Sequence, residues 1–160
     1  MKKDNYIPDY AQTKEKALRL LEFRTHSEKE LFVKLKRTGA EDETINSVMG
    51  FLKEYNLVDD EKYAINYALD LQNLKKFGKN RIMGELSKKG ISREYIQQAV
   101  ENLPDLSDDV LPELVAKRLK GNFDNKNKEK VIRYFLYRGY SLDDIKKAIQ
   151  KQTEEDSYEL

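Results

Sequence analysis

The ten residues Arg81–Gly90 (RIMGELSKKG) have counterparts in Glu30–Gly39 (ELFVKLKRTG) and Lys130–Gly139 (KVIRYFLYRG). Each segment ends in glycine, and the three glycines lie 51 and 49 residues apart. Self-similarity at a nearly constant period of this size indicates tandem repeats, each forming one supersecondary unit.

Apolar residues occur at four fixed distances from each glycine. Those eight and four residues before it are Leu31 and Leu35, Ile82 and Leu86, and Val131 and Phe135. Those six and ten residues after it are Ile45 and Met49, Ile96 and Val100, and Ile145 and Ile149. Residues four apart share one face of a helix, so each glycine stands between two amphipathic helices. Glycine ends a helix readily because it adopts the left-handed conformation without a Cβ penalty.

Several helix starts are marked by polar residues. Ser27 and Glu30 have the spacing of a capping box, in which each side chain accepts from the other residue's backbone amide. His26 precedes this box and is expected to pack towards Leu31, which is a structural rather than a catalytic role. Ser92 and Ser141 are N-cap candidates after the second and third glycines.

A further helix before each glycine segment completes a three-helix unit. These helices are predicted over Tyr10–Arg24, Asp60–Lys76 and Asp108–Lys120. We therefore predict an all-α fold of three tandem, helix-turn-helix-like repeats that form an elongated, curved array. The predicted boundaries are 1–58 for the first repeat with a short N-terminal tail, 59–106 for the second, 107–152 for the third and 153–160 for an acidic, frayed tail.

The composition argues against catalysis. The 160 residues include no cysteine and one histidine, so thiolate chemistry and a multi-histidine metal site are excluded. No glycine-rich phosphate loop, dinucleotide fingerprint or nucleophile with a base partner is recognisable. We therefore expect a binding protein with no catalytic residue, no metal and no cofactor, rather than an enzyme.

Net charge and hydropathy limit the partners and the cellular location that can be expected for the chain. The 30 Lys and Arg and 29 Asp and Glu give a net charge of +1, so any affinity for nucleic acid must come from local patches. No apolar run approaches the roughly 20 residues that span a bilayer, and the N-terminus lacks the apolar core of a signal peptide. A cytoplasmic protein without a membrane partner is expected.

The remaining candidates for contacts with a partner are basic and aromatic residues. Basic residues precede each glycine and cluster around Lys75–Arg81 and Lys126–Arg133. They are interpreted either as compensation of helix C-termini or as contacts to phosphate or to an acidic protein surface. Tyr134, Tyr137 and Tyr140 suit stacking on a base or filling a protein pocket, while Tyr134 and Tyr140 suit a core equally well.

Four stretches of the chain resemble the RecX family, bacterial regulators of the RecA recombinase. They are Ala17–Leu31, Leu57–Ala64, Gly78–Ile91 and Arg133–Tyr140, and they follow the family's order. The resemblance implies three tandem three-helix repeats. It also implies binding of the RecA filament within its helical groove, with inhibition of recombinase, ATPase and coprotease activities.

The expected partner is therefore the RecA filament, with direct DNA binding through the helix-turn-helix-like repeats as the alternative function. A monomer is expected. Basic residues near the repeat turns are the predicted contacts to the partner or to phosphate: Lys34, Arg37, Arg81, Lys88, Lys89, Arg93, Arg133 and Arg138.

Overall fold

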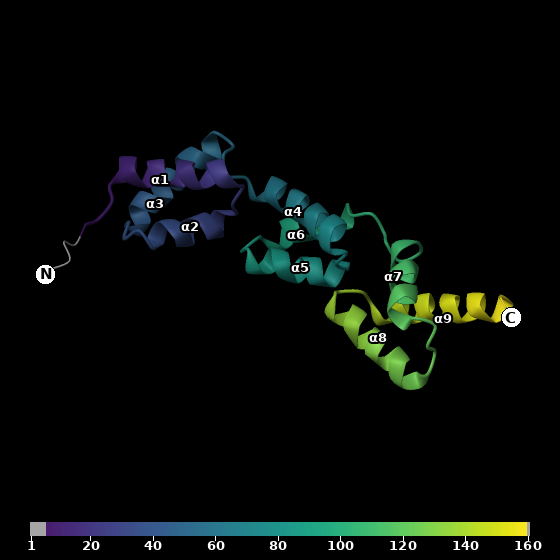
Figure 1. Cartoon of the computed structure of the whole chain (residues 1–160). Helices are drawn as coiled ribbons and strands as arrows, with labels where there is room; N and C mark the ends of the chain where they lie inside the picture. Colours follow the sequence, from purple (N-terminus) through teal and green to yellow (C-terminus); the bar gives the residue numbers. More distant parts are fainter. Residues whose placement is uncertain (1–5, 160) are drawn as a thin grey trace, which may run out of the picture. The chain divides into compact units, whose positions relative to one another are not determined.

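Nine helices and no strands make up the regular structure of the described part of the chain, residues 6–159 of a computed structural model (Figure 1). In chain order they are α1 Tyr10–Phe23, α2 Glu28–Lys36, α3 Asp42–Glu54, α4 Asp60–Lys75, α5 Lys79–Lys88, α6 Arg93–Glu101, α7 Val110–Leu119, α8 Asn125–Tyr137 and α9 Leu142–Tyr158. The predicted all-α class is confirmed, and the helices form three successive sets of three. None of the described helices is long and apolar enough to span a membrane.

The helix starts follow the polar residues in the sequence. Asp9, Ser27 and Ser141 cap α1, α2 and α9, and each side chain accepts from the backbone amide three residues on. The predicted capping box is confirmed, because the Glu30 amide donates to Ser27 Oγ over 3.2 Å and the Ser27 amide donates to Glu30 Oε1 over 3.4 Å. At the other end of the chain, α9 continues to Tyr158 and so includes most of the segment 153–160 for which the sequence suggested a frayed tail.

The repeated glycines end the middle helix of each set. Gly39, Gly90 and Gly139 have φ values of 93°, 77° and 100°. After α8, the Gly139 amide donates to Leu136 O over 3.0 Å and the Tyr140 amide donates to Phe135 O over 3.1 Å. This pair of bonds is a Schellman motif, which satisfies carbonyls that the helix end leaves free. The sequence interpretation of these glycines as helix stops is therefore confirmed.

The apolar register around the glycines is buried. Of the twelve positions, eleven are at most 8% exposed, from Leu31 and Leu35 in the first repeat to Ile145 and Ile149 in the third. Ile96 is the exception and is partly buried. The repeat pattern therefore identifies core positions, as the two-helix interpretation requires.

The contacts between residues divide the chain into two compact units. The first comprises residues 1–67 and 86–99, and the second comprises residues 68–85 and 100–160. The division passes through all three helices of the second set. Each unit therefore contains one outer set of helices together with part of the middle set.

In the first unit, α1, α2 and α3 enclose one apolar core. Fully buried members are Ala17, Leu31, Leu35, Ile45, Val48 and Leu52. In the second unit, α7, α8 and α9 enclose another core, with Leu111, Val115, Val131, Phe135, Ile145 and Ala148 inside it. Side chains of about this size each gain roughly 1.5–3 kcal/mol on complete burial, so these two cores are the main source of stability.

Candidate partner-binding surfaces

In the first unit, the turn at Gly90 lies against the N-terminus of α2. Ser27 Oγ donates to Lys89 O over 2.6 Å while it accepts from the Glu30 amide. A Cβ atom built on Gly90 would overlap the side chain of Lys29. The cap of α2 is therefore also the contact point for the turn between α5 and α6.

In the second unit, the turn at Gly139 lies in the same way against the N-terminus of α5. The Gly78 amide donates to Arg138 O over 2.9 Å, and the Asn80 amide donates to Gly139 O over 3.1 Å. A Cβ atom on Gly139 would overlap the backbone of Arg81. Gly78 lies 51 residues after Ser27, the same offset as between Gly39 and Gly90. Equivalent positions of the repeat therefore build both junctions.

A charged cluster surrounds Glu30 at the first junction. Its carboxylate accepts from Arg24 over 2.7 Å, from the Tyr63 hydroxyl over 2.8 Å and from Lys89 over 3.4 Å. Burial raises the pKa of this carboxyl, but hydrogen bonds from Arg24, Tyr63 and the Ser27 amide outweigh burial and hold the pKa at about 2. Burial and the hydrogen bond to Glu30 both raise the pKa of Tyr63. Glu30 is thus ionised at neutral pH and ties α2 to α4 and to the Gly90 turn.

Arginine and aromatic side chains take the place of this cluster at the second junction. The Arg81 guanidinium lies 4.9 Å from the centre of the Phe77 ring and 4.8 Å from that of Tyr137. Arg138 lies 4.9 Å from the Phe77 ring and donates to Lys75 O. The Tyr140 hydroxyl donates to Lys76 O over 2.6 Å. Both arginines therefore hold the α4–α5 segment against the turn between α8 and α9.

His26 is buried in the first unit. Its Nδ1 lies 2.9 Å from Arg24 O, and its Nε2 lies 2.8 Å from Lys34 Nζ. These partners suit a neutral ring that donates from Nδ1 and accepts at Nε2. Burial lowers the pKa of His26. His26 thus lies in the packed interior of the first unit, and its packing towards Leu31 stays a prediction.

The eight predicted contact residues fall into two groups. Lys34, Arg81, Lys89 and Arg138 are partly buried and make the intramolecular contacts described above. The other four have exposed side chains: Arg37, Lys88, Arg93 and Arg133. The sequence could not separate the groups, because the contacts of Lys89 and Arg138 are to residues about 60 positions away along the chain.

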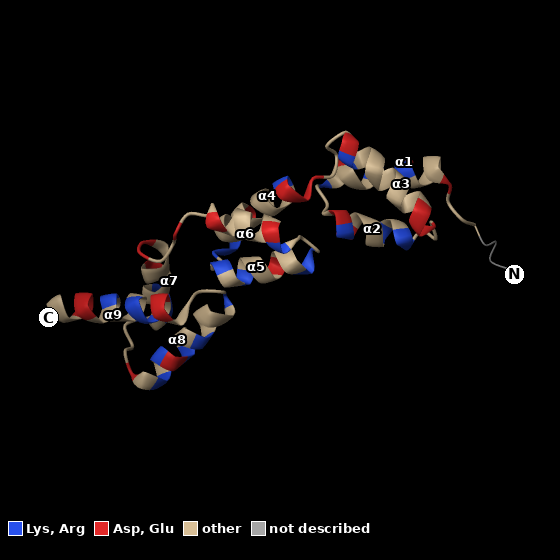
Figure 2. Cartoon of the chain, turned by 180° about the vertical axis from the view of Figure 1, so that it is seen from behind, with Lys and Arg blue, Asp and Glu red and all other residues tan. Residues whose placement is uncertain are grey.

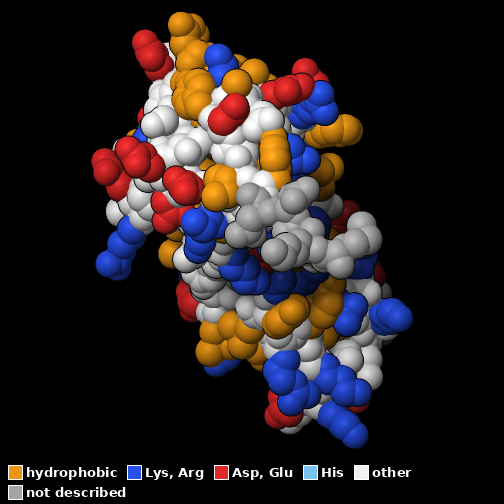
Figure 3. All heavy atoms as spheres, turned by 90° about the vertical axis from the view of Figure 1, so that its left-hand side faces the viewer, with side chains coloured by type: hydrophobic (Ala, Val, Ile, Leu, Met, Phe, Trp, Pro, Cys, Tyr) orange, Lys and Arg blue, Asp and Glu red, His pale blue; other side chains and the backbone are white. Residues whose placement is uncertain are grey.

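The outer face of α8 carries several exposed basic residues of the second unit. Lys126, Lys130 and Arg133 are exposed along it together with Glu129, and Figure 2 shows blue segments and a red one on this helix. Tyr137 at the end of this helix is also exposed. In the space-filling view of Figure 3, basic and hydrophobic side chains likewise lie next to one another. Such mixed surfaces suit contacts with acidic protein or phosphate.

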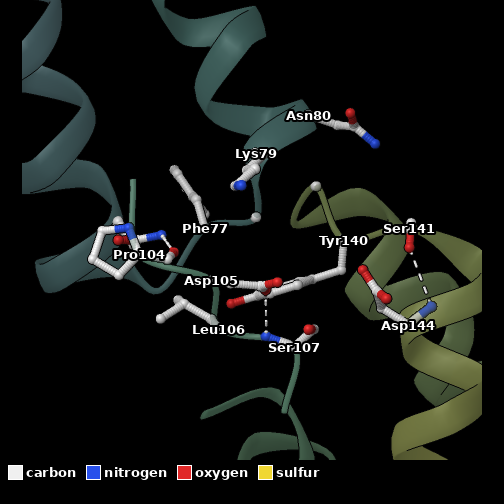
Figure 4. A pocket seen from close by; sticks show the side chains of 13 residues that line it. Phe77, Lys79, Asn80, Pro104, Asp105, Leu106, Ser107, Tyr140, Ser141 and Asp144 are labelled. Carbon is white, nitrogen blue, oxygen red and sulfur yellow. Dashed lines mark hydrogen bonds between the residues drawn. The ribbon is translucent and has the colours of Figure 1, made fainter. Parts of the chain in front are cut away.

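A cleft of about 250 Å³ opens in the second unit between the start of α5, the segment 104–107 and the start of α9 (Figure 4). Its charged residues are Lys79, Asp105 and Asp144. The Ser107 amide donates to Asp105 over 2.9 Å and lowers the pKa of that carboxyl. Gln72 Nε2 donates to Pro104 O over 2.9 Å, whereas Gln72 Oε1 is buried without a partner. Across the described residues, no cluster of His, Asp and Glu has an arrangement that could hold a metal ion.

Family comparison gives two adjoining matches. Residues 14–52 match the model described as RecX, first three-helix domain, and residues 59–100 match RecX, second three-helix domain. The matched stretches contain the first two repeated glycines, the whole of α2 and α5 before them, and most of α3 and α6 after them.

Individual relatives cover nearly the whole chain. A protein named Regulatory protein RecX from Clostridium perfringens (strain SM101) is 33% identical over 96% of this chain and 72% of its own length. One of the same name from Salmonella paratyphi A is 35% identical over 86% of this chain and 90% of its own length. The crystal structure of RecX from Lactobacillus salivarius superposes with a TM-score of 0.78 at 26% identity, covering 89% of this chain and 96% of that one.

Proposed function

Because the chain belongs to the RecX family of regulatory proteins, we propose that it binds the RecA nucleoprotein filament within its helical groove and inhibits recombinase, ATPase and coprotease activities. The observation that carries this proposal is the match to relatives named Regulatory protein RecX over nearly the full chain. In this proposal the chain acts in the cytoplasm, as a monomer, without a cofactor and without catalysis of its own.

The proposed mechanism is steric and electrostatic. Three repeats, 1–58, 59–106 and 107–152, lie along the groove and bridge neighbouring filament subunits. Exposed cations beside the turns, Arg37, Lys88, Arg93 and Arg133, meet acidic protein surface or DNA phosphate. Lys34, Arg81, Lys89 and Arg138 act indirectly, because their intramolecular contacts shape the turns that carry the exposed cations.

Titration of the chain into RecA, single-stranded DNA and ATP tests the proposal through the rate of ATP hydrolysis. We expect inhibition that saturates with added chain and weakens at higher salt, because surface charge pairs are screened. Full ATP hydrolysis at every ratio of chain to RecA would refute the proposal.

Substitution separates the exposed cations from the rest of the surface. Arg93→Ala and Arg133→Ala are expected to raise the concentration needed for half-inhibition, each by about threefold to tenfold. Lys146→Ala is the matched control, since Lys146 is an exposed cation of α9 outside the predicted contact set. Equal losses in all three variants would show that the proposed contacts are wrong.

Direct DNA binding is the second candidate function, and the basic face of α8 favours it. In that case the chain would bind naked DNA with a steep salt dependence, because each neutralised phosphate releases counterions. Fluorescence anisotropy with a labelled oligonucleotide over a salt series distinguishes the two functions. Tight, salt-sensitive binding without an effect on RecA would favour DNA as the primary partner.

A further inference from the structure

A second hollow in the second unit, of about 300 Å³, is surrounded by cations. Its charged lining consists of Lys75, Lys76, Lys117, Arg118, Lys120 and Arg138, and no carboxylate contributes to it. Leu114, Tyr134 and Phe135 supply the apolar part of the lining. The hollow is therefore a small concave site with one sign of charge, unlike the cleft of mixed charge at the start of α5.

Helix C-termini account for only part of this charge. α4, α7 and α8 end beside the hollow, and each C-terminus carries about half a negative charge. Glu113 neutralises a further part, since it lies 3.4 Å from Lys117. Six cations still leave a surplus of roughly three positive charges over these nearby negative groups. Neutralising the partial negative charges of the helix C-termini does not by itself require six cations in one place.

Two of the lysines occupy an unfavourable backbone conformation. Lys76 and Lys120 have φ values of 55° and 53°, and among the described residues the remaining non-glycine residue with positive φ is Asn56. Glycine or asparagine adopts this left-handed conformation at lower cost than lysine does. Both residues directly follow a helix, Lys76 after α4 and Lys120 after α7, so the left-handed conformation here belongs to a helix-ending turn.

The guanidinium groups of the hollow are ordered before any ligand arrives. Arg118 stacks 3.6 Å above the centre of the Tyr134 ring, and Arg138 lies 5.6 Å from the same centre. Arg138 is held further by its hydrogen bond to Lys75 O. A planar guanidinium group can donate to two oxygens of one phosphate at once. If the guanidinium is already held in place, less conformational entropy is lost when phosphate binds.

We propose that this hollow binds the phosphate groups of a small free polyphosphate, of the class of inorganic triphosphate or a nucleoside triphosphate. Six basic residues line one hollow whose volume is at the lower end of small-molecule sites. A nucleic acid strand would instead be expected to use a longer groove that follows its backbone. The site lies beyond the proposed regulatory function and does not depend on it.

Isothermal titration calorimetry of the full chain with sodium triphosphate tests the site, with wild type compared to Lys120→Asn and Arg118→Gln. We expect saturable binding at low salt that each substitution weakens about tenfold. Lys120→Asn is informative because asparagine tolerates the left-handed backbone, so this variant loses the charge without a folding penalty. Lys146→Asn is the control, since Lys146 is an exposed cation of α9 outside the hollow.

Each contrary result overturns the site. Absence of heat with millimolar triphosphate would do so, as would equal binding by Lys120→Asn and Lys146→Asn. A competition experiment between triphosphate and a single-stranded oligonucleotide tests whether the hollow binds the phosphates of a nucleic acid instead. If Arg118→Gln weakens only oligonucleotide binding and triphosphate never competes, the hollow belongs to a nucleic acid surface and the proposal is wrong.

Discussion

At Gly139, a side chain would meet two obstacles at once. The residue has a φ of 100°, and a Cβ atom would overlap the backbone of Arg81, which cannot yield as a flexible side chain could. We therefore expect Gly139→Ala to lower the free energy of unfolding by about 2–4 kcal/mol. Urea unfolding followed by circular dichroism measures the change.

Gly84→Ala is the matched control for this substitution. Gly84 lies inside α5 with nothing within 4 Å of a Cβ atom, so alanine is expected to stabilise the chain by about 0.5–1 kcal/mol. If both variants shifted the unfolding midpoint in the same direction, close packing at the Gly139 turn would not be the cause.

His26 makes stability depend on pH near neutrality. Burial lowers its pKa in the folded chain, and the charges of Arg24 and Lys34 act in the same direction, whereas the hydrogen bond to the Arg24 carbonyl and the charge of Glu30 oppose them. Below an unfolded pKa of about 6.5, the unfolded chain binds a proton that the folded chain resists. Stability is therefore fully present above that pH and falls as the pH drops through and below it.

Urea midpoints between about pH 7.5 and pH 5.5 measure the effect of His26, which is the single histidine of the sequence. The wild-type midpoint is expected to fall over this range, and His26→Gln should flatten the dependence. An equally steep decline in His26→Gln would assign the effect to another group.

Among the elements, α2 and α4 are joined through Glu30 and Tyr63. Tyr63→Phe removes the 2.8 Å hydrogen bond and is expected to cost about 1 kcal/mol. Because the pKa of Glu30 is held at about 2, its contribution is present above its ordinary pKa and is lost as the pH falls towards 2. The loss in free energy of unfolding caused by Tyr63→Phe should therefore become smaller as the pH falls towards 2.

A double-mutant cycle with Glu30→Gln isolates the coupling between the two side chains from their separate roles in packing. Tyr55→Phe is the control, since the Tyr55 side chain is 62% exposed in the same unit. Additive losses in the cycle would contradict a direct link between α2 and α4 through this pair.

The same elements show what sequence could predict and what it could not. The spacing of Leu31, Leu35 and Ile45 around Gly39 reports local helix geometry, so the helices and their buried faces could be predicted. The contact of Ser27 with Lys89 joins residues 62 positions apart, and nothing in either segment alone specifies it. For the same reason, Arg81 and Arg138 looked like free surface cations, although each is tied to aromatic rings and carbonyls.

For the molecule as a whole, two separate cores predict local rather than global effects of core mutations. Leu35→Ala in the first unit and Phe135→Ala in the second are each expected to cost about 2–5 kcal/mol. Hydrogen exchange followed by mass spectrometry should show faster exchange mainly in α1–α3 for the first variant and in α7–α9 for the second. Equal acceleration throughout by either variant would mean that the two units unfold as one.

The first copy of the glycine turn differs from the other two in what covers it. A Cβ atom on Gly39 would meet Tyr6 O at 3.6 Å and Pro8 Cδ at 3.9 Å, which is ordinary contact with the segment just before the N-cap Asp9 of α1. In engineering terms, residues 6–8 cover at this turn the surface that a helix N-terminus covers at the other two turns. Grafting a duplicate of the repeat ahead of it, with Ser27-like and Lys29-like positions facing Gly39, should lengthen the protein by one unit without redesign of its cores.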